Sequence, residues 1–565
     1  MKKLFIYTFL LLAGTVVAQT KAQNPANPLD FDMSLSGGFC ELRANHFHAG
    51  VDVRTKGVEG HSVHAVAKGY VSRVTVSPFG YGLAVYITHP GDSIISVYGH
   101  LQRFNSHIAA IVKEKQYKNE SYTVDIKFDP GAIPVSQGEV IAFSGNSGSS
   151  AAPHLHLEIR DMKNGDYLDP LVYFKKYIKD TRKPFVRELV IYPVEGKGVV
   201  NGSSKKQIIK VETDKNENPV VDAAIEAYGA IGLGIRAIDR MDGTTFSYGI
   251  KDILQTVDSV ETYRSYADRF AYEESRYLNS YTDYEEYSRR NVFYIKTFVE
   301  PGNRAGFIAS RNSGIINITE EREYNVTVAL SDIYKNVSKV NLKIKGRKQD
   351  IAPPDTAGNK LMRWYDYNSF STKGIRLTVP RNSLYSNLYM AYSAIADNKY
   401  YSPIHVLHNS PVPLHSSAQL SISVSEQLTP PNTKQLGIVR INSRNGNAVW
   451  IGGSYRDGWL DSEIQELGKY TVSRDVDPPV ITPVNPDKWI NGRQITVRIK
   501  DDLSGVYTYR GEIDGKYALF EYDAKKALIT YKFDDKRLRP GSHRLRITVT
   551  DQCGNRSRYE YAFSL

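Results

Sequence analysis

Residues 154–159 read His-Leu-His-Leu-Glu-Ile, and this short stretch decides the fold prediction. Side chains alternate between the two faces of a strand, so His154 and His156 share one face and Leu155 and Leu157 the other. Two imidazoles on one face, with apolar residues behind them, suit a metal-binding cleft. The alternative is a pair of surface histidines, and the stretch alone does not choose between the two.

The sequence around this stretch is typical of β structure. Between about residues 28 and 178, short alternating runs such as 69–76 and 83–88 are broken by glycine and proline. No long helical pattern appears in this range. We therefore predict a mainly β chain that begins with an antiparallel β domain over residues 28–178.

A second motif, His48-Ala49-Gly50-Val51-Asp52, belongs to the same histidine-rich region, because nine of the 13 histidines lie between His46 and His156. Gly50 and the β-branched Val51 disfavour a helix. On a strand and turn, the His48 and Asp52 side chains can still converge on one ion. A third motif, residues 98–101, reads Tyr-Gly-His-Leu and follows a predicted strand.

Taken together, the motifs supply the donors of a catalytic zinc site. Two histidines and one aspartate are three protein ligands, which leaves one tetrahedral position for water. Zinc lowers the pKa of that water and polarises a carbonyl. The remaining histidines, His100 and His154, are then available to move protons and to stabilise an oxyanion.

Residues 45–161 resemble the lysostaphin/LytM-type zinc metallopeptidase family in both motifs and motif order. The matching positions are His48 to Asp52, Gly60, Val63, Ala65, Gly69, Val71, Tyr81-Gly82, Tyr98 to Leu101, Val135, Gly138, Ile141, residues 145–149 and Pro153 to His156. The resemblance implies one Zn²⁺ per chain, held by His48, Asp52 and His156. It implies His100 and His154 as catalytic residues, without deciding which is the general base, and it implies that Tyr98 packs.

The sequence departs from the family pattern at several points. His46 is close enough to His48 to compete for a metal, although the pattern favours His48. His61 and His64 stand where the family has small or apolar residues, and we expect them to be exposed. Residues 103–134 form an insertion that we expect to extend one wall of the substrate groove.

Downstream of Asp180 the chain repeats a pattern. Residues 180–184 and 475–479 both run from aspartate to proline before an apolar strand, and residues 328–336 resemble 547–555. This layout predicts immunoglobulin-like β-sandwich modules at 180–348 and 476–565, with an accessory β domain at 350–475. Eight tyrosines lie in residues 263–294, which we expect to form a loop or a short helical insertion packed on a neighbouring domain.

The N-terminus is typical of a secretory signal peptide. Lys2 and Lys3 precede the apolar run 4–17, which is too short to span a bilayer, and Ala18 ends a small-residue cleavage site. We predict that residues 1–18 are removed and that the protein reaches the periplasm or cell envelope or is secreted, without a transmembrane anchor. A retained anchor is the alternative. The two cysteines, Cys40 and Cys553, leave pairing open, with separate buried thiols favoured.

The formal net charge of +11 favours attraction to anionic polymers such as the cell wall. The basic residues are scattered, which argues against a nucleic-acid site. Protein partners are not predicted. The favoured function is a zinc endopeptidase that cuts peptidoglycan stem or cross-bridge peptides. The alternatives are a catalytically silent LytM-type module that binds or activates other wall hydrolases, and an adhesion protein whose sandwich modules carry the function.

Overall fold

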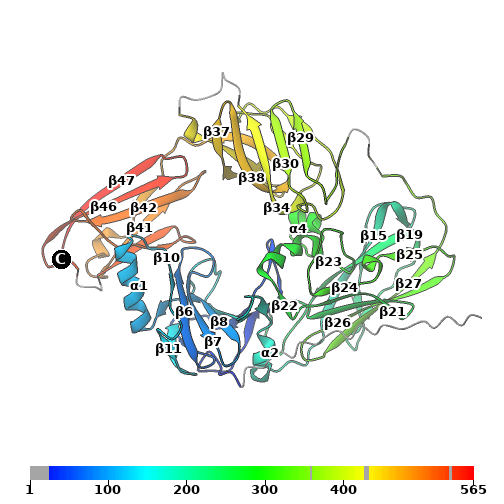
Figure 1. Cartoon of the computed structure of the whole chain (residues 1–565), viewed down its shortest axis with the longest axis horizontal. Coiled ribbons are helices and arrows are strands. Elements are labelled where there is room, and N and C mark those ends of the chain that lie inside the picture. Colours follow the sequence, from blue (N-terminus) through cyan, green and yellow to red (C-terminus); the bar gives the residue numbers. More distant parts are fainter. Residues whose placement is uncertain (1–23, 355, 357–358, 425–431, 534–536) are drawn as a thin grey trace, which may run out of the picture.

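Four β units follow one another around a ring in the computed structural model (Figure 1). The structure describes residues 24–354, 356, 359–424, 432–533 and 537–565. The expected signal peptide, residues 1–18, lies outside these residues. No helix in the described residues is both long enough and apolar enough to cross a membrane.

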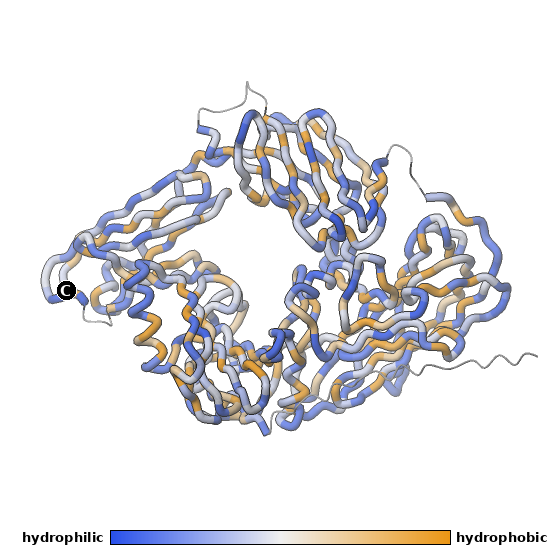
Figure 2. Tube along the Cα trace, in the orientation of Figure 1, coloured by the Kyte–Doolittle hydropathy of each residue, from blue (hydrophilic) through white to orange (hydrophobic). Residues whose placement is uncertain are grey.

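Hydrophobic and hydrophilic residues alternate along the strands (Figure 2). In β27 (Val337–Gly346), for example, buried and exposed residues alternate along the whole strand. This is the pattern of a strand with one face on a core and one in solvent. The expectation of a mainly β chain is confirmed.

The N-terminal unit contains the main sheet that positions the histidine motifs. Its antiparallel strands run in the order β1 (Leu35–Gly37), β4 (Val51–Arg54), β13 (His154–Asp161), β8 (Ile94–Leu101), β7 (Leu83–His89), β6 (Gly69–Val76) and β10 (Val124–Lys127). Shorter strands complete the unit, namely β2 (Leu42–Arg43), β3 (His46–Phe47), β5 (Ser62–His64), β9 (Arg103–Phe104), β11 (Pro134–Val135), β12 (Val140–Phe143) and β14 (Tyr167–Leu168).

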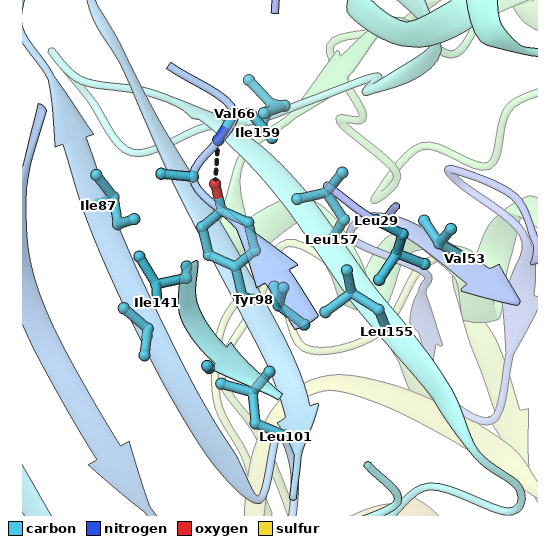
Figure 3. Packing of buried hydrophobic residues seen from close by; sticks show 14 of the residues in the cluster. Leu29, Val53, Val66, Ile87, Tyr98, Leu101, Ile141, Leu155, Leu157 and Ile159 are labelled. Carbon is cyan, nitrogen blue, oxygen red and sulfur yellow. Dashed lines mark hydrogen bonds between the residues drawn. The ribbon is translucent and has the colours of Figure 1, made fainter. Parts of the chain in front are cut away.

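Tyr98 lies in the middle of the N-terminal core (Figure 3). Its ring is fully buried, and its hydroxyl accepts a hydrogen bond of 2.9 Å from the backbone N–H of Val66. Tyr98 is therefore a packing residue, as the family resemblance implied.

Residues 103–134 contain a helix that the sequence analysis did not predict, α1 (Ser106–Lys118). The Asn105 side chain caps it by accepting a hydrogen bond from the N–H of Ile108. Ile108, Val112 and Gln116 are its buried residues, a stripe one residue wide and four residues apart. A stripe so narrow, with a polar residue as its third member, gives little periodic signal. The helix lies beside the C-terminal unit (Figure 1).

The second unit is built on one large sheet. Its strands are β15 (Phe185–Val200), β16 (Gln207–Lys210), β19 (Ile225–Ile238), β20 (Asp252–Val257), β21 (Val260–Tyr266), β23 (Ile295–Lys296), β24 (Ile308–Ser310), β25 (Ile316–Ile318), β26 (Glu323–Ser331) and β27. A further strand, β22 (Arg269–Phe270), pairs with β14 and so joins the first two units.

The tyrosine-rich segment folds into strand β21 and short helices, including α3 (Leu278–Tyr281) and α4 (Tyr284–Arg290). It packs on the third unit, as expected. The Tyr277 ring stacks on His415 at 4.4 Å, and the Tyr284 hydroxyl donates a 2.6 Å hydrogen bond to Glu466.

The third and fourth units each contain two antiparallel sheets around one core. In the third unit, one sheet consists of β29 (Asn368–Thr372), β30 (Ile375–Val379), β34 (Val412–Ser423), β38 (Trp459–Leu467) and β37 (Ser454–Arg456). The other consists of β32 (Ser393–Ile395), β33 (Ile404–Val406), β39 (Lys469–Arg474), β35 (Leu436–Ile441) and β36 (Ala448–Gly452). In the fourth unit, one sheet consists of β40 (Val480–Pro483), β41 (Gln494–Lys500), β45 (Leu528–Lys532) and β44 (Glu521–Asp523). The other consists of β43 (Lys516–Tyr517), β42 (Val506–Ile513), β46 (Ser542–Asp551) and β47 (Arg556–Ser564).

The fourth unit returns to the first and closes the ring (Figure 1). Arg510 forms an ion pair of 2.7 Å with Glu120, just after α1. The Lys525 ammonium donates to the backbone carbonyl oxygens of Asn146 and Ser150, at 2.9 Å for Ser150. Despite this closure, Cys40 and Cys553 are both buried free thiols.

Candidate metal centre

The three predicted ligands come together because two neighbouring strands place them side by side. Strand β13 pairs with β4, and in this register His156 lies directly opposite Asp52. His48 reaches the same point from the turn that precedes β4. That turn needs a glycine at position 50, since a Cβ there would lie 2.4 Å from the carbonyl oxygen of Leu157.

The geometry of the three side chains fits a tetrahedral metal. His48 Nε2 lies 3.0 Å from Asp52 Oδ1 and 3.1 Å from His156 Nδ1, and the last two atoms are 3.0 Å apart. Donors about 2.0 Å from a zinc ion at tetrahedral angles lie about 3.3 Å from one another. The spacing and the donor types therefore fit zinc, and all three side chains are buried.

Partners behind the ligands hold them in this orientation. His48 Nδ1 is 2.7 Å from the Gly38 carbonyl oxygen, and His156 Nε2 is 2.9 Å from Glu158 Oε1. A carboxylate or carbonyl behind a ligand imidazole fixes its tautomer and orientation, so that the opposite nitrogen faces the metal. Glu158 is itself held by Arg160 at 2.6 Å and by the Tyr81 hydroxyl at 2.5 Å.

The charges of the cluster keep its carboxylates ionised. Burial acts to raise the pKa of Asp52, but the His48, His154 and His156 imidazoles hold it well below its usual value. Burial likewise opposes ionisation of Glu158, and Arg160 and His156 nevertheless lower its pKa to about 2. Burial acts to lower the pKa of His156, but hydrogen bonds to Asp52 and Glu158 raise it to about 9 in the metal-free site.

His100 and His154 meet the same site from its other side. Their ring centroids are 4.8 Å apart, and His154 Nε2 lies 3.3 Å from Asp52 Oδ1. His100 is the last residue but one of β8 and has a positive φ of 58°, and its Nδ1 is 2.9 Å from the Ser147 carbonyl oxygen. His154 Nδ1 is 2.8 Å from the Ala152 carbonyl oxygen. Each ring thus turns its Nε2 away from the backbone.

The pKa of His100 is lowered to about 3, first by burial and then by the neighbouring His156 and His154 rings. His100 is therefore neutral at physiological pH. With its Nδ1 proton donated to a carbonyl, it presents an Nε2 lone pair, the form in which an imidazole accepts a proton.

The other histidines of the region do not join the cluster. His46 is exposed, and its Nδ1 contacts the carbonyl oxygen of Ala44 at 2.8 Å. His61 and His64 are half-buried, so the expectation that they are exposed is wrong. His64 lies 2.6 Å from Asp30, and His61 packs edge-on against Phe31 at 5.0 Å.

The groups that orient the ligands were not predicted from the sequence. Glu158 has a signal in the sequence, because it continues the alternation of His154 and His156 and so shares their face. The carbonyl oxygens of Gly38 and Ser147 have none, since any residue type supplies a carbonyl.

A cavity of about 530 Å³ adjoins the site, between α1 and the fourth unit. Ser147 lines this cavity and also bonds to His100. Residues 103–134 thus contribute a wall through α1, and the facing wall comes from the fourth unit, including Tyr522 and Lys526.

Two parts of the chain match known family models. Residues 46–117 match peptidase family M23, and residues 359–475 match the Zu5-like domain, which defines the accessory unit more closely than its sequence pattern did. No curated protein matches the chain.

Several solved structures are similar to about a quarter of the chain. The catalytic domain of a mutant of the prophage-encoded M23 protein EnpA from Enterococcus faecalis is 25% identical over 26% of this chain and 94% of its own, with a TM-score of 0.19. The catalytic domain of the antimicrobial peptidase lysostaphin from Staphylococcus simulans is 22% identical over 24% of this chain and 89% of its own (TM-score 0.19). A zinc-containing peptidase from Vibrio cholerae is 22% identical over 26% and 39% (TM-score 0.19).

Proposed function

The chain contains an M23 metallopeptidase domain with a candidate His-Asp-His zinc site, and from this premise we propose that it is a zinc-dependent endopeptidase cutting peptidoglycan stems or cross-bridges. The observation that carries the proposal is the register of β4 and β13. It brings His48, Asp52 and His156, distant in sequence, within 3.1 Å of one another.

His48, Asp52 and His156 would hold the zinc. When bound, zinc supplies Lewis acidity, which lowers the pKa of water toward about 7 and polarises a scissile carbonyl. Glu158 and the Gly38 carbonyl orient the two imidazoles, while Arg160 keeps Glu158 ionised.

His100 and His154 are the proposed proton carriers. Each donates its Nδ1 proton to a backbone carbonyl and presents Nε2 toward the cluster. One ring accepts a proton from the attacking water and passes it to the leaving amine. The other ring, when its own Nε2 carries a proton, donates a hydrogen bond to the carbonyl oxygen as negative charge develops there. Their similar bonding leaves the assignment to experiment.

Peptidoglycan is the proposed substrate because of the M23 match and the basic chain. Removal of Lys2 and Lys3 with the signal peptide lowers the formal net charge from +11 to +9, which still favours contact with the anionic polymers of a cell wall. We further propose export to the periplasm or cell envelope, or secretion, on the pattern of residues 1–18.

For the accessory part we propose a domain division at 180–348, 350–475 and 476–565, with immunoglobulin-like sandwiches in the first and last. The two four-stranded sheets of the fourth unit, around one core, support this assignment for the last module, and the sequence pattern that residues 328–336 share with 547–555 extends it to the first.

Mass analysis of a defined peptidoglycan digest tests the function. The zinc-loaded mature protein is expected to release peptides cut at one type of amide bond, and a chelator should abolish the products until zinc is restored. A zinc-loaded protein that releases nothing, yet stimulates another wall hydrolase in the same assay, would replace the proposal with the silent-activator alternative.

A further inference from the structure

Three aspartates meet in the second unit, outside the histidine cluster. Asp180 lies in the segment that enters the unit, Asp239 directly follows β19, and Asp332 directly follows β26. One carboxylate oxygen from each lies within 4.8 Å of those from the other two. Their exposed fractions are 7%, 3% and 3%, so the group is buried.

These carboxylates have no counter-charge from the protein. Within the described residues, no ion pair joins any of the three to a lysine, arginine or histidine, and the charges that act most on Asp180 and Asp239 are those of other aspartates. Burying one unpaired carboxylate is already unfavourable, and three neighbours of like charge add repulsion. A protein that places three such groups together requires either bound protons or a bound cation.

Two oxygens in the cluster are also left without hydrogen bonds. Asp180 Oδ2 and Asp239 Oδ1 are buried and have no partner. Other oxygens of the cluster do accept hydrogen bonds. Asp180 Oδ1 accepts one from the Arg182 N–H at 3.0 Å. Asp332 accepts from the N–H and side chain of Asn336 at 2.9 and 2.7 Å. Buried orphan acceptors beside well-satisfied ones point to a missing ligand.

The same arrangement recurs in the fourth unit. Asp475, Asp501 and Asp551 also form a close group in which Asp475 enters the unit and Asp501 directly follows a strand. Asn555 bonds to Asp551 at 2.8 Å through both its N–H and its side chain, as Asn336 does to Asp332. Each asparagine also donates to the backbone carbonyl of the entering aspartate. A repeated geometry of this detail indicates a shared role.

We propose that Asp180, Asp239 and Asp332 bind a divalent cation, Ca²⁺, that fastens the segment leaving the N-terminal unit to the sheet of the second unit. Ca²⁺ takes carboxylate and carbonyl oxygens at about 2.3–2.6 Å, so oxygens on opposite sides of one ion lie about 5 Å apart. Three oxygens within 4.8 Å fit around one such ion. Asp180 lies where the chain passes from one unit to the next, between Tyr177 and the start of β15 at Phe185, so the cation would be held at this junction.

The pKa directions agree with a cation that replaces bound protons. Burial, followed by the charge of Asp332, raises the pKa of Asp239 to about 8. Burial also raises the pKa of Asp180 to about 6, with Asp332 adding to the effect.

Calcium titration of the zinc-loaded full chain, freed of calcium by exhaustive dialysis against calcium-free buffer without a chelator, tests the proposal. Isothermal titration should show Ca²⁺ binding. At a free concentration about 100 times Kd, the thermal midpoint of the second unit should rise by about 5–10 °C. Asp239→Asn keeps the side-chain shape and removes one buried charge. It should therefore fold without calcium, bind one equivalent less than the wild type, and lose the shift.

Two further variants sharpen the result. Asp180→Asn, which keeps the acceptor for Arg182, should behave like Asp239→Asn. Asp222→Asn, at an exposed aspartate of the same unit, should bind calcium like the wild type. The proposal is overturned if the wild type shows neither heat nor thermal shift at 10 mM Ca²⁺. It is also overturned if Asp239→Asn keeps the full number of sites, or if Mg²⁺ at equal concentration gives the same shift.

Discussion

His156 and Asp52 face each other across two paired strands, and His48 joins them from a tight turn. At the scale of single residues, this juxtaposition makes three polar side chains a candidate metal centre. Glu158 and the Gly38 carbonyl add the orientation that a ligand imidazole requires.

Removing a ligand should remove the metal. His48→Ala or His156→Ala is expected to lose both bound zinc, measured by elemental analysis, and peptide cleavage. His46→Ala is the matched control, because His46 is exposed, lies two residues from His48 and does not contact the cluster. Full cleavage by either ligand variant, or zinc loss in the control, would contradict the assignment.

Removing a proton carrier should instead spare the metal. His100→Ala and His154→Ala are expected to keep one zinc and to lose about 10²–10⁴-fold in kcat. The variant that also loses the acidic limb of the pH–rate profile identifies the general base. An unchanged rate in both variants would exclude these residues from catalysis.

Zinc binding should release a proton at neutral pH. In the metal-free protein the pKa of His156 is raised to about 9, above its usual value, so the ring is protonated at pH 7 and must lose its proton to bind. The stability that this proton gives the metal-free protein is present below pH 6.5 and is lost as the pH rises through about 9. The thermal shift on adding zinc should therefore grow over that window.

Calorimetry checks the stoichiometry of this release. Zinc titrations at pH 7 in buffers of different ionisation enthalpy should differ by the heat of about one proton. A binding heat that does not depend on the buffer would show that His156 is already neutral.

At the scale of elements, the alternation in residues 154–159 predicted β13 correctly, because a buried strand face leaves a period of two in the sequence. The helix α1 was not predicted, since its buried side is a single narrow stripe. The orienting carbonyls of Gly38 and Ser147 were not predictable either, because their role depends on the folded backbone and not on a side chain.

The close packing of β4 on β13 makes its own prediction. Gly50→Ala would place a methyl group 2.4 Å from the Leu157 carbonyl oxygen, so the strands must separate. We expect a loss of about 1–3 kcal/mol in the free energy of unfolding, together with weaker zinc binding. Gly91→Ala is the control, since its Cβ meets nothing within 4 Å. Denaturant unfolding of both variants would contradict the prediction if Gly50→Ala were as stable as the control.

At the scale of the whole molecule, the fourth unit reaches back to the rim of the metal centre. The Lys525 ammonium donates a hydrogen bond to the backbone carbonyl oxygen of Ser150. The side-chain hydroxyl oxygen of the same serine lies 3.2 Å from His154 Nδ1. No sequence pattern foretold this contact, because Lys525 and Ser150 are 375 residues apart and meet only through the arrangement of all four units.

Breaking this contact should affect rate and not metal. Lys525→Ala is expected to keep one zinc and to lower kcat/KM by about 2–10-fold, the worth of one or two hydrogen bonds to the loop that positions His154. Lys516→Ala, at an exposed position of the same unit, should cleave at the wild-type rate. Equal rates for the two variants would show that ring closure does not influence the site.

Anomalous scattering at the zinc edge, from crystals of the zinc-loaded chain, tests the metal centre most directly. The geometry predicts a peak about 2.0–2.1 Å from His48 Nε2, Asp52 Oδ1 and His156 Nδ1. A zinc peak elsewhere, with those three side chains unliganded, would contradict it.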